Sequence, residues 1–362
     1  MRLGLFLAYW PWFTPQEQVE LAVLGDELGL DSIWISEAWG RDAVSVLGLL
    51  AGKTERIALG SGLMQIPARQ PTATAMAAAS LDVLSNGRFR LGLGLSGPQV
   101  SEGWYGVPFA RPLSRTREYV EVVRTALARR TVRHDGREFP LPLPADAPGA
   151  SGLGRPLKLL ASPVQERIPV YLGSIGPKAV EQTGAIADGW LPFLLSPDQP
   201  EMLLDPLRTG AACAGRTLDQ IDVAPVVPTA VAETVEQARD LVRPWLAFYL
   251  GAMGAKDKNF YVELADRYGH GDAARTCQQR MLDGDRVGAA HALTDGLIDA
   301  GTIATTPDGL ADRVRRYAAI GADTLVIVPC GDKPAVVRAV AEAVAGASGA
   351  VGGPSPAGAG TP

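Results

Sequence analysis

Short apolar runs alternate with longer segments in which apolar residues recur every three to four positions, starting at the N-terminus. The first apolar runs predict four buried strands, at 3–8, 32–36, 57–62 and 89–93. The periodic segments between them predict three amphipathic helices, at 15–29, 42–52 and 71–85. Strands that alternate with helices in this way favour a parallel sheet covered by helices.

The alternation returns after a proline-rich stretch. Four further strands are predicted at 168–173, 189–195, 221–231 and 323–329. Helices are predicted at 111–129, 177–187, 199–214 and 334–345, with another beginning at Thr306 and a mostly helical stretch at 234–300. Eight strands in this order predict an α/β fold of the TIM (β/α)8 barrel type. The barrel is expected to carry insertions after the fourth and seventh strands, at about 96–168 and 234–305.

Length and composition fit one large domain. The 362 residues suit a single barrel over 1–345, and the uncharged residues 346–362 predict a flexible tail. The net charge of −5, with acids and bases interspersed, leaves no basic face for nucleic acid. No apolar run reaches the about 18 residues of a membrane span, and the N-terminus resembles a strand more than a signal peptide. The three cysteines and three histidines are widely spaced, so neither disulfides nor a metal site is expected. Together these features favour a cytoplasmic protein.

Two neighbouring strands run into small residues where they should leave the sheet. The segments GSGLM at 60–64 and GLGLSG at 92–97 follow apolar runs and flank one predicted helix. Small residues let the main chain approach a flat ligand closely, so this edge predicts a cofactor site. The alternative is that these glycines only ease the packing of helices on strands.

Polar residues follow the second and third strands at the same edge. Glu37 could hydrogen-bond a heterocycle, or donate a proton if burial raised its pKa, and Trp39 could form a wall against a planar ring. The alternative for Glu37 is an ion pair with Arg41. Asp42 is expected to cap the next helix. Gln65 and Arg69 are further polar candidates.

The fifth strand ends at 173 and is followed by a predicted helix that begins near Pro177. Ser174 or Gly176 could be its N-cap, and the free amide groups would hold a phosphate. Lys178 in the first turn supports an anion there, although it could equally be a solvated side chain. Gly92 and Gly94 lack the third glycine of a dinucleotide fingerprint.

The loop after the fourth strand carries Glu102, Trp104 and Tyr105. These aromatic residues could shape a substrate pocket, with Tyr105 polarising a carbonyl, or they could pack beneath the loop. No Ser/His/Asp or Cys/His arrangement is present that would support nucleophilic catalysis.

At these motifs the chain resembles the bacterial-luciferase-like superfamily of flavin and deazaflavin enzymes. It is most similar to the actinobacterial oxidoreductases that use coenzyme F420. The resemblance covers about 1–345 and rests on the motifs SEAWGRD at 36–42, GSGLMQIPAR at 60–69, GLGLSGPQVSEGWYG at 92–106, GPK at 176–178 and GAMGAKDKNFY at 251–261.

The resemblance implies a TIM barrel whose carboxyl-terminal rim holds the deazaflavin, with a non-proline cis peptide bond between Gly62 and Leu63. Glu37 would meet the polar edge of the ring. The residues that would line the ring are Gln65, Leu95 and Ser96, with Gln99 as a looser match. The residues that would hold the phosphate-bearing tail are Ile175, Gly176, Lys178 and Ala179. Relatives of this kind form homodimers.

The chain departs from the family pattern at two positions. Ala38 stands where many relatives have a histidine, and Gly97 stands where some have a catalytic glutamate. The candidates for proton delivery are therefore Glu37, Gln99, Glu102 and Tyr105.

Three functions follow from the resemblance. The first is an oxidoreductase that moves hydride between coenzyme F420 and a small-molecule or peptide substrate, reducing a carbonyl or an activated C=C bond. The second is an FMN-dependent luciferase-like monooxygenase. The third is a non-catalytic deazaflavin-binding protein that has lost its acid. The residues do not identify the substrate.

Overall fold

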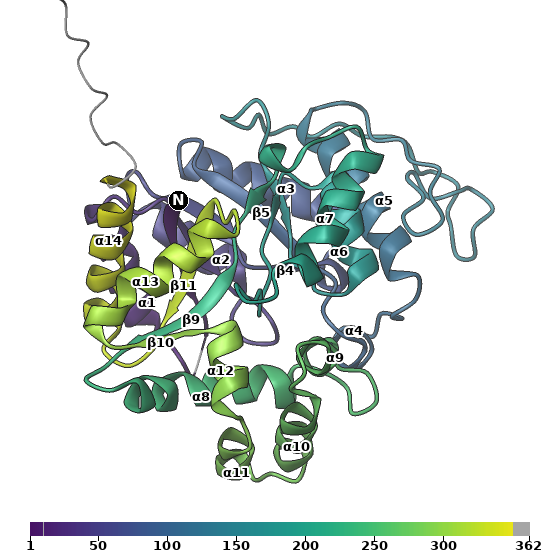
Figure 1. The fold of residues 1–362 in the computed structure, drawn as a ribbon. Coiled ribbons are helices and arrows are strands. Elements are labelled where there is room, and N and C mark those ends of the chain that lie inside the picture. Colours follow the sequence, from purple (N-terminus) through teal and green to yellow (C-terminus); the bar gives the residue numbers. More distant parts are fainter. Residues whose placement is uncertain (10, 350–362) are drawn as a thin grey trace, which may run out of the picture.

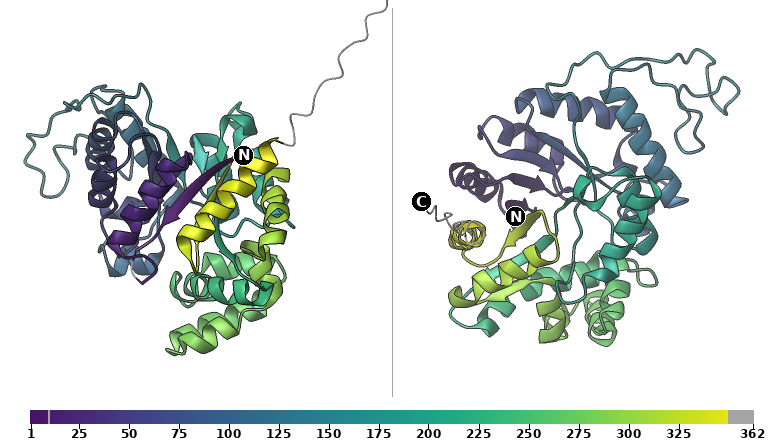
Figure 2. Two further views of the ribbon diagram at one scale, coloured as in Figure 1. Left: turned by 90° about the vertical axis from the view of Figure 1, so that its left-hand side faces the viewer. Right: turned by 45° about the horizontal axis from the view of Figure 1, so that its top comes forward.

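The computed structural model describes residues 1–9 and 11–349. Parallel strands curl into a barrel, and helices surround it (Figure 1, and the right-hand view of Figure 2). The strands are β1 (Arg2–Leu7), β2 (Ser32–Ile35), β3 (Ala58–Ser61), β4 (Met64–Gln65), β5 (Phe89–Gly94), β6 (Val170–Leu172), β7 (Gly189–Trp190), β8 (Asp222–Val223), β9 (Val226–Val231), β10 (Ile303–Thr305) and β11 (Thr324–Pro329).

The helices follow the strands in the predicted order. They are α1 (Pro15–Glu27), α2 (Ala43–Ala51), α3 (Pro71–Leu84), α4 (Pro98–Gly103), α5 (Pro112–Leu127), α6 (Pro177–Ile186), α7 (Glu201–Cys213), α8 (Val235–Ala252), α9 (Phe260–Arg267), α10 (Gly271–Leu282), α11 (Arg286–His291), α12 (Asp295–Gly301), α13 (Pro307–Ala319) and α14 (Lys333–Gly349), with short 3-10 turns η1 (Ile66–Ala68) and η2 (Leu218–Gln220). Within the described residues, no helix is both long and apolar enough to span a membrane.

The strand pairing closes the barrel. β1 pairs with β2 on one side and with β11 on the other, and the path continues through β3, β5, β6 and β7 to β8. β8 and β9 are consecutive parts of one extended segment, and β9 pairs with β11. The eight predicted strand positions therefore form a ring, which confirms the predicted α/β barrel.

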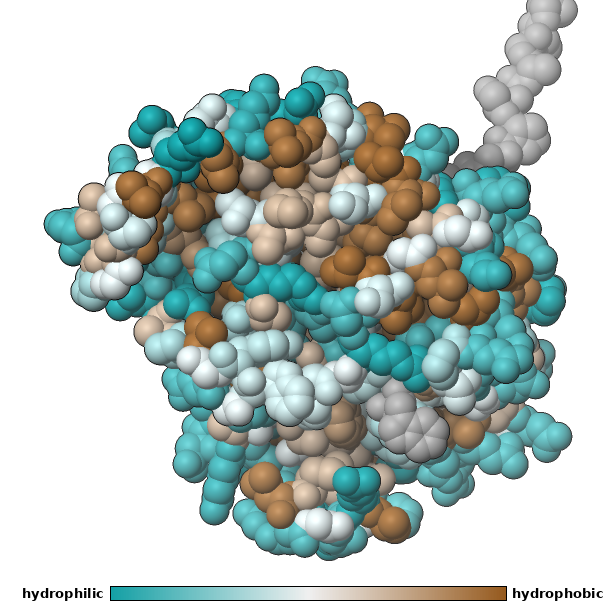
Figure 3. All heavy atoms as spheres, turned by 180° about the vertical axis from the view of Figure 1, so that it is seen from behind, coloured by the Kyte–Doolittle hydropathy of each residue, from teal (hydrophilic) through white to brown (hydrophobic). Residues whose placement is uncertain are grey.

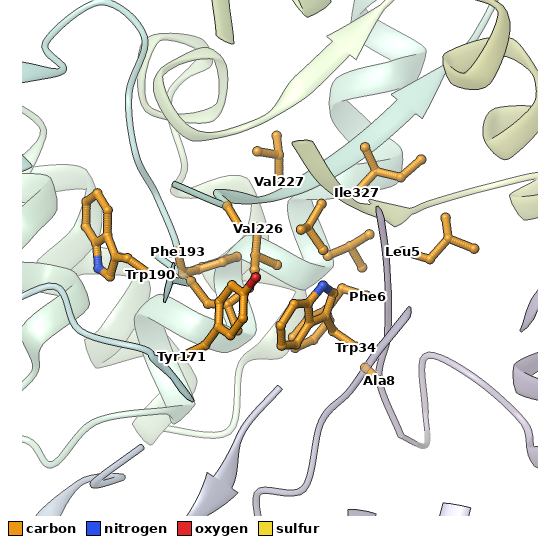
Figure 4. Close-up of a cluster of buried hydrophobic side chains, with 14 of the residues drawn as sticks. Leu5, Phe6, Ala8, Trp34, Tyr171, Trp190, Phe193, Val226, Val227 and Ile327 are labelled. Atoms are coloured by element: carbon orange, nitrogen blue, oxygen red, sulfur yellow. The ribbon is translucent and has the colours of Figure 1, made fainter. Parts of the chain in front are cut away.

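Large side chains fill the interior of the barrel. Figure 4 shows residues of β1, β2, β6, β9 and β11 meeting there. The rings of Trp34 and Tyr171 meet edge to face with their centroids 4.7 Å apart. A Cβ on Gly60 would lie 2.3 Å from the Trp34 ring, and one on Gly189 would lie 2.1 Å from the Tyr171 ring. These two glycines make room for the aromatic core inside the barrel.

The two insertions lie after β5 and β9, as predicted. The first holds α4, α5 and an extended irregular stretch, and the second holds α8 to α12, which form the lower part of the molecule in Figure 1. β10 at the end of the second insertion was not predicted, because three residues between two helices are too few to show a strand period. α14 continues to Gly349, so 346–349 are helical, and the rest of the expected tail lies outside the described residues.

The surface carries exposed apolar side chains, which gather on the back of the molecule (Figure 3). On the neighbouring helices α2 and α3 they are Leu49, Met76, Val83 and Leu84. Exposed apolar patches on a folded domain mark surfaces for association.

Candidate functional site

A cavity of about 560 Å³ opens at the carboxyl ends of the barrel strands. Its walls come from the residues that follow β1, β2, β5, β6 and β7, together with α8 and α9. This volume falls within the range of small-molecule and cofactor sites. The barrel rim is also where enzymes of this fold place their chemistry.

The structure brings nearly all of the predicted cofactor residues into this cavity. The predicted residues in its wall are Glu37, Trp39, Gly62, Leu63, Gln65, Leu95, Ser96, Ser174, Ile175, Gly176, Lys178 and Ala179. Gln99 is not in the wall. Its Nε2 donates a 3.5 Å hydrogen bond to the carbonyl oxygen of Ala252, which ties the first insertion to the second.

Two candidates for proton delivery after β5 are not in the cavity wall, and one of them, Glu102, lies in α4 and not in a loop. Glu102 is exposed and accepts a 2.9 Å hydrogen bond from the amide of Phe109. Tyr105 directs its hydroxyl at the carbonyl oxygen of Ala38, 3.5 Å away. Burial, with a contribution from the nearby Glu37 charge, raises the pKa of Tyr105. Trp104 is 66% exposed. It therefore neither shapes the pocket nor packs beneath the loop, which were the two roles considered for it. Sequence position alone did not give the direction of these side chains.

Glu37 is paired with Arg69, not with Arg41. The Arg69 guanidinium donates two hydrogen bonds to the Glu37 carboxylate, of 2.8 Å and 2.6 Å. The backbone amide of Gln65 donates a third, of 3.0 Å, and that of Ala43 a weaker one, of 3.4 Å. Arg41 instead donates to the side-chain oxygen of Gln18 at 2.7 Å. The arrangement favours a positioning role for Glu37, because its oxygens are already occupied by protein donors.

Asp42 has two partners at the start of α2. It caps the helix as predicted, accepting a 2.7 Å hydrogen bond from the amide of Ser45. It also pairs with the guanidinium of Arg69. The pKa of Arg69 is raised, mainly by its hydrogen bonds to Glu37 and also by the charges of the Glu37 and Asp42 carboxylates. These effects outweigh burial, which lowers it. The end of β2 and the segment after β4 are thereby locked together.

The glycines at the strand ends divide into two groups. A Cβ on Gly92 would lie 1.9 Å from the carbonyl oxygen of Ser61, so this glycine serves the close approach of β3 and β5. Added Cβ atoms on Gly94 and Gly173 would instead lie 2.8 Å and 2.2 Å from Cδ1 of Leu63, which forms part of the cavity wall. The peptide bond between Gly62 and Leu63 is cis, as the resemblance implied.

Three non-glycine residues at the rim have left-handed backbone conformations. They are Ala38 with φ 43°, Ser96 with φ 62° and Leu194 with φ 61°. Such conformations are costly for residues with a Cβ and concentrate at functional sites. Ala38 and Ser96 line the cavity. No sequence signal marks them, since neither is a residue type that favours this conformation.

Two buried polar atoms at the cavity wall have no hydrogen-bond partner among the described residues. They are Oγ of Ser36 and Oε1 of Gln65. An unpaired buried polar atom is unfavourable unless a ligand or water satisfies it. The two atoms suit the polar edge of a heterocycle, which presents both donors and acceptors.

The N-terminus of α6 forms another part of the wall. Gly176 is the N-cap, and no side chain caps the helix. Ser174, the other predicted cap, instead shares a 2.8 Å hydrogen bond with the hydroxyl of Thr183. Lys178 is largely exposed, and its ammonium lies 2.8 Å from Glu181. The first amides of α6 are therefore available to an anion, while the charge of Lys178 already has a partner.

Aromatic residues form a further part of the wall, and they were missed from the sequence. Tyr9 follows β1, Tyr249 lies in α8, Tyr261 lies in α9 and Phe193 follows β7. Tyr249 belongs to an ordinary amphipathic pattern that indicates packing. Tyr261 falls within a family-like motif, but nothing in that motif points to the cavity.

Comparison with known proteins identifies the family of the chain. The model of the luciferase-like monooxygenase family matches residues 1–324. A Mycobacterium tuberculosis protein, provisionally named a coenzyme F420-dependent oxidoreductase, is 38% identical over 334 residues, covering 91% of this chain and 95% of that protein. The 5,10-methylenetetrahydromethanopterin reductase of Archaeoglobus fulgidus is 28% identical over 333 residues, covering 90% of this chain and 92% of that one. The structure of the coenzyme F420-dependent tetrahydromethanopterin reductase from Methanopyrus kandleri superposes with a TM-score of 0.82 at 25% identity, covering 96% of this chain and 99% of that one.

Proposed function

Because this chain belongs to the luciferase-like monooxygenase family, we propose that it is an oxidoreductase that moves hydride between coenzyme F420 and an organic substrate. The proposed direction is reduction of a carbonyl or an activated C=C bond. The related proteins named for coenzyme F420 support the choice of cofactor over FMN.

The observation that carries the proposal is the wall around Leu63. Gly94 and Gly173 leave room for this side chain, because a Cβ on either would lie within 3 Å of its Cδ1. Ser36 and Gln65 line the cavity too, and each has a buried polar atom without a partner among the described residues. A flat apolar surface with a polar border suits a tricyclic ring that has one polar edge. The residues present therefore fit a deazaflavin.

The chain would hold the cofactor with three groups of residues. Ser36 and Gln65 would hydrogen-bond the polar edge of the ring, and the first amides of α6 after Gly176 would bind the phosphate. The pair of Glu37 and Arg69 keeps the loop between them in place. When bound, coenzyme F420 supplies the hydride, and the protein contributes orientation and an apolar wall that excludes water.

Steady-state oxidation of reduced coenzyme F420 tests this function. Reduced F420 is mixed with the protein and a panel of ketones, enones and alcohol controls, and the absorbance of the oxidised cofactor is followed. We expect oxidation that depends on both the protein and a carbonyl or enone. Oxygen consumption with reduced FMN, and no reaction with reduced F420, would instead identify a monooxygenase.

A further inference from the structure

Three tyrosines from distant parts of the chain line the cavity, and none of them is among the residues proposed to hold the cofactor. Tyr9 follows β1, Tyr249 lies in α8 and Tyr261 in α9. The barrel and its second insertion thus both contribute to one surface. None of the three has a part in the proposed cofactor contacts.

The hydroxyl groups of these tyrosines open on the cavity. Tyr9 and Tyr249 are each only 8% exposed. Within the described part of the chain, none of the three hydroxyls has a hydrogen-bond partner. Yet none is among the fully enclosed unpaired atoms, a group that includes the hydroxyl of Tyr317. The exposed part of each side chain therefore includes its hydroxyl.

Packing fixes the rings. The centroid of Tyr249 lies 4.2 Å from that of Phe193 and 5.2 Å from that of Trp245. Tyr261 meets Tyr249 edge to face at 5.5 Å. Phenylalanine would make the same ring contacts, and a buried tyrosine normally finds a partner for its hydroxyl. Three hydroxyls without a protein partner are therefore available to a ligand in the cavity.

The three hydroxyl groups are neutral. Burial raises the pKa of Tyr261 to about 12, and burial with neighbouring tyrosines raises the pKa values of Tyr9 and Tyr249 further. The hydroxyls therefore stay protonated at physiological pH. Lys258 and Glu263 of the second insertion also line the cavity, with opposite charges. The Lys258 ammonium lies 5.7 Å from the ring centroids of both Phe109 and Phe260.

We propose that Tyr9, Tyr249 and Tyr261 form the substrate subsite and that it takes an uncharged, largely apolar carbonyl compound. The hydroxyls donate hydrogen bonds to the carbonyl oxygen, and the aromatic rings contact the apolar body. A phosphorylated sugar would place its negative charges against aromatic rings and neutral hydroxyls. The proposal rests on the proposed function for the fate of the bound compound, but binding itself needs no cofactor.

Calorimetric titration of the full-length protein without added cofactor tests the subsite. The probes are 1-tetralone, tetralin, which has the same rings without the oxygen, and glucose 6-phosphate. We expect 1-tetralone to bind about tenfold more tightly than tetralin, and glucose 6-phosphate not to compete. The variant with Tyr9→Phe, Tyr249→Phe and Tyr261→Phe should lose this preference and keep its affinity for tetralin.

The matched control is Tyr317→Phe, which removes an enclosed unpaired hydroxyl in α13, outside the cavity wall. It should leave the preference for the ketone unchanged. Equal binding of the ketone and the hydrocarbon by the unmodified protein would overturn the proposal, as would a preference that survives in the triple variant. Titration of the same proteins with coenzyme F420 separates the two proposals. If the protein prefers the ketone but does not bind F420, the proposed subsite stands and the proposed cofactor is wrong.

Discussion

Arg69 holds Glu37 through two parallel hydrogen bonds, between residues that lie 32 positions apart in the chain. The Glu37 side chain is buried and that of Arg69 is mostly so. The pair connects the end of β2 to the segment that follows β4, and both segments form the cavity wall. The shape of the proposed cofactor site therefore depends on this contact.

Replacing Arg69 should destabilise the fold. Arg69→Met leaves the Glu37 carboxylate buried without its main partner, so we expect the free energy of unfolding to fall by about 3 kcal/mol. Urea denaturation measures it. Arg41→Met is the control, because Arg41 contacts the neutral amide of Gln18 and its loss should cost about 1 kcal/mol or less. Equal losses in the two variants would contradict the assigned role of the pair.

Gly173→Ala should weaken cofactor binding more than it weakens the fold. The added Cβ would meet Cδ1 of Leu63 at 2.2 Å, so this side chain, which lines the cavity, has to shift. We expect the affinity for coenzyme F420 to fall by about tenfold or more, measured by fluorescence titration. Gly48→Ala in α2, where an added Cβ meets nothing within 4 Å, should leave the affinity unchanged. A Gly173→Ala protein that binds as tightly as the parent would argue against the flat wall.

A charged cap on α6 should have opposite effects on stability and binding. Gly176 has φ −75°, and an added Cβ meets nothing within 4 Å. In Gly176→Asp the carboxylate caps the free amides, so stability should rise by about 0.5 kcal/mol, while phosphate binding is blocked and repelled. Gly176→Asn is the uncharged comparison and should lose less affinity for the cofactor. If neither variant changes that affinity, the phosphate lies elsewhere.

We further propose that the chain forms a homodimer through α2 and α3. Met76 and Leu84 are 60% and 63% exposed on α3, next to Leu49 of α2. Light scattering after size-exclusion chromatography should give twice the mass of one chain. The double variant Met76→Asp and Leu84→Asp should give the mass of one chain, while Val287→Asp on α11 should have no effect. A monomeric parent protein would rule out this interface.

The barrel was predictable from the sequence, because apolar runs and helical periods alternate clearly at each of its eight strand positions. The same pattern could not distinguish the roles of two glycines. Gly60 accommodates Trp34 and Gly94 accommodates Leu63, but the sequence does not show which side chain packs against each glycine. The alternative that Glu37 pairs with Arg41 was wrong for a related reason. Arg41 is nearer in the chain, but the fold brings Arg69 to it.

The aromatic wall could not be predicted from the sequence either. Tyr249 follows a helical period that indicates core packing, and only the fold shows that its hydroxyl faces a cavity shared with Tyr9. The left-handed backbone of Ala38 also had no signal, because alanine does not favour that conformation. Residues whose role depends on distant neighbours could not be assigned before the fold was known.

The central claim is that the barrel mouth holds a deazaflavin. Equilibrium titration of the full-length protein with oxidised coenzyme F420 and, separately, with FMN tests it most directly, with cofactor fluorescence as the signal. We predict saturation by F420 in the micromolar range or below, with FMN bound at least about tenfold more weakly. Tighter binding of FMN, or no saturation by F420 at about 100 μM, would contradict the account.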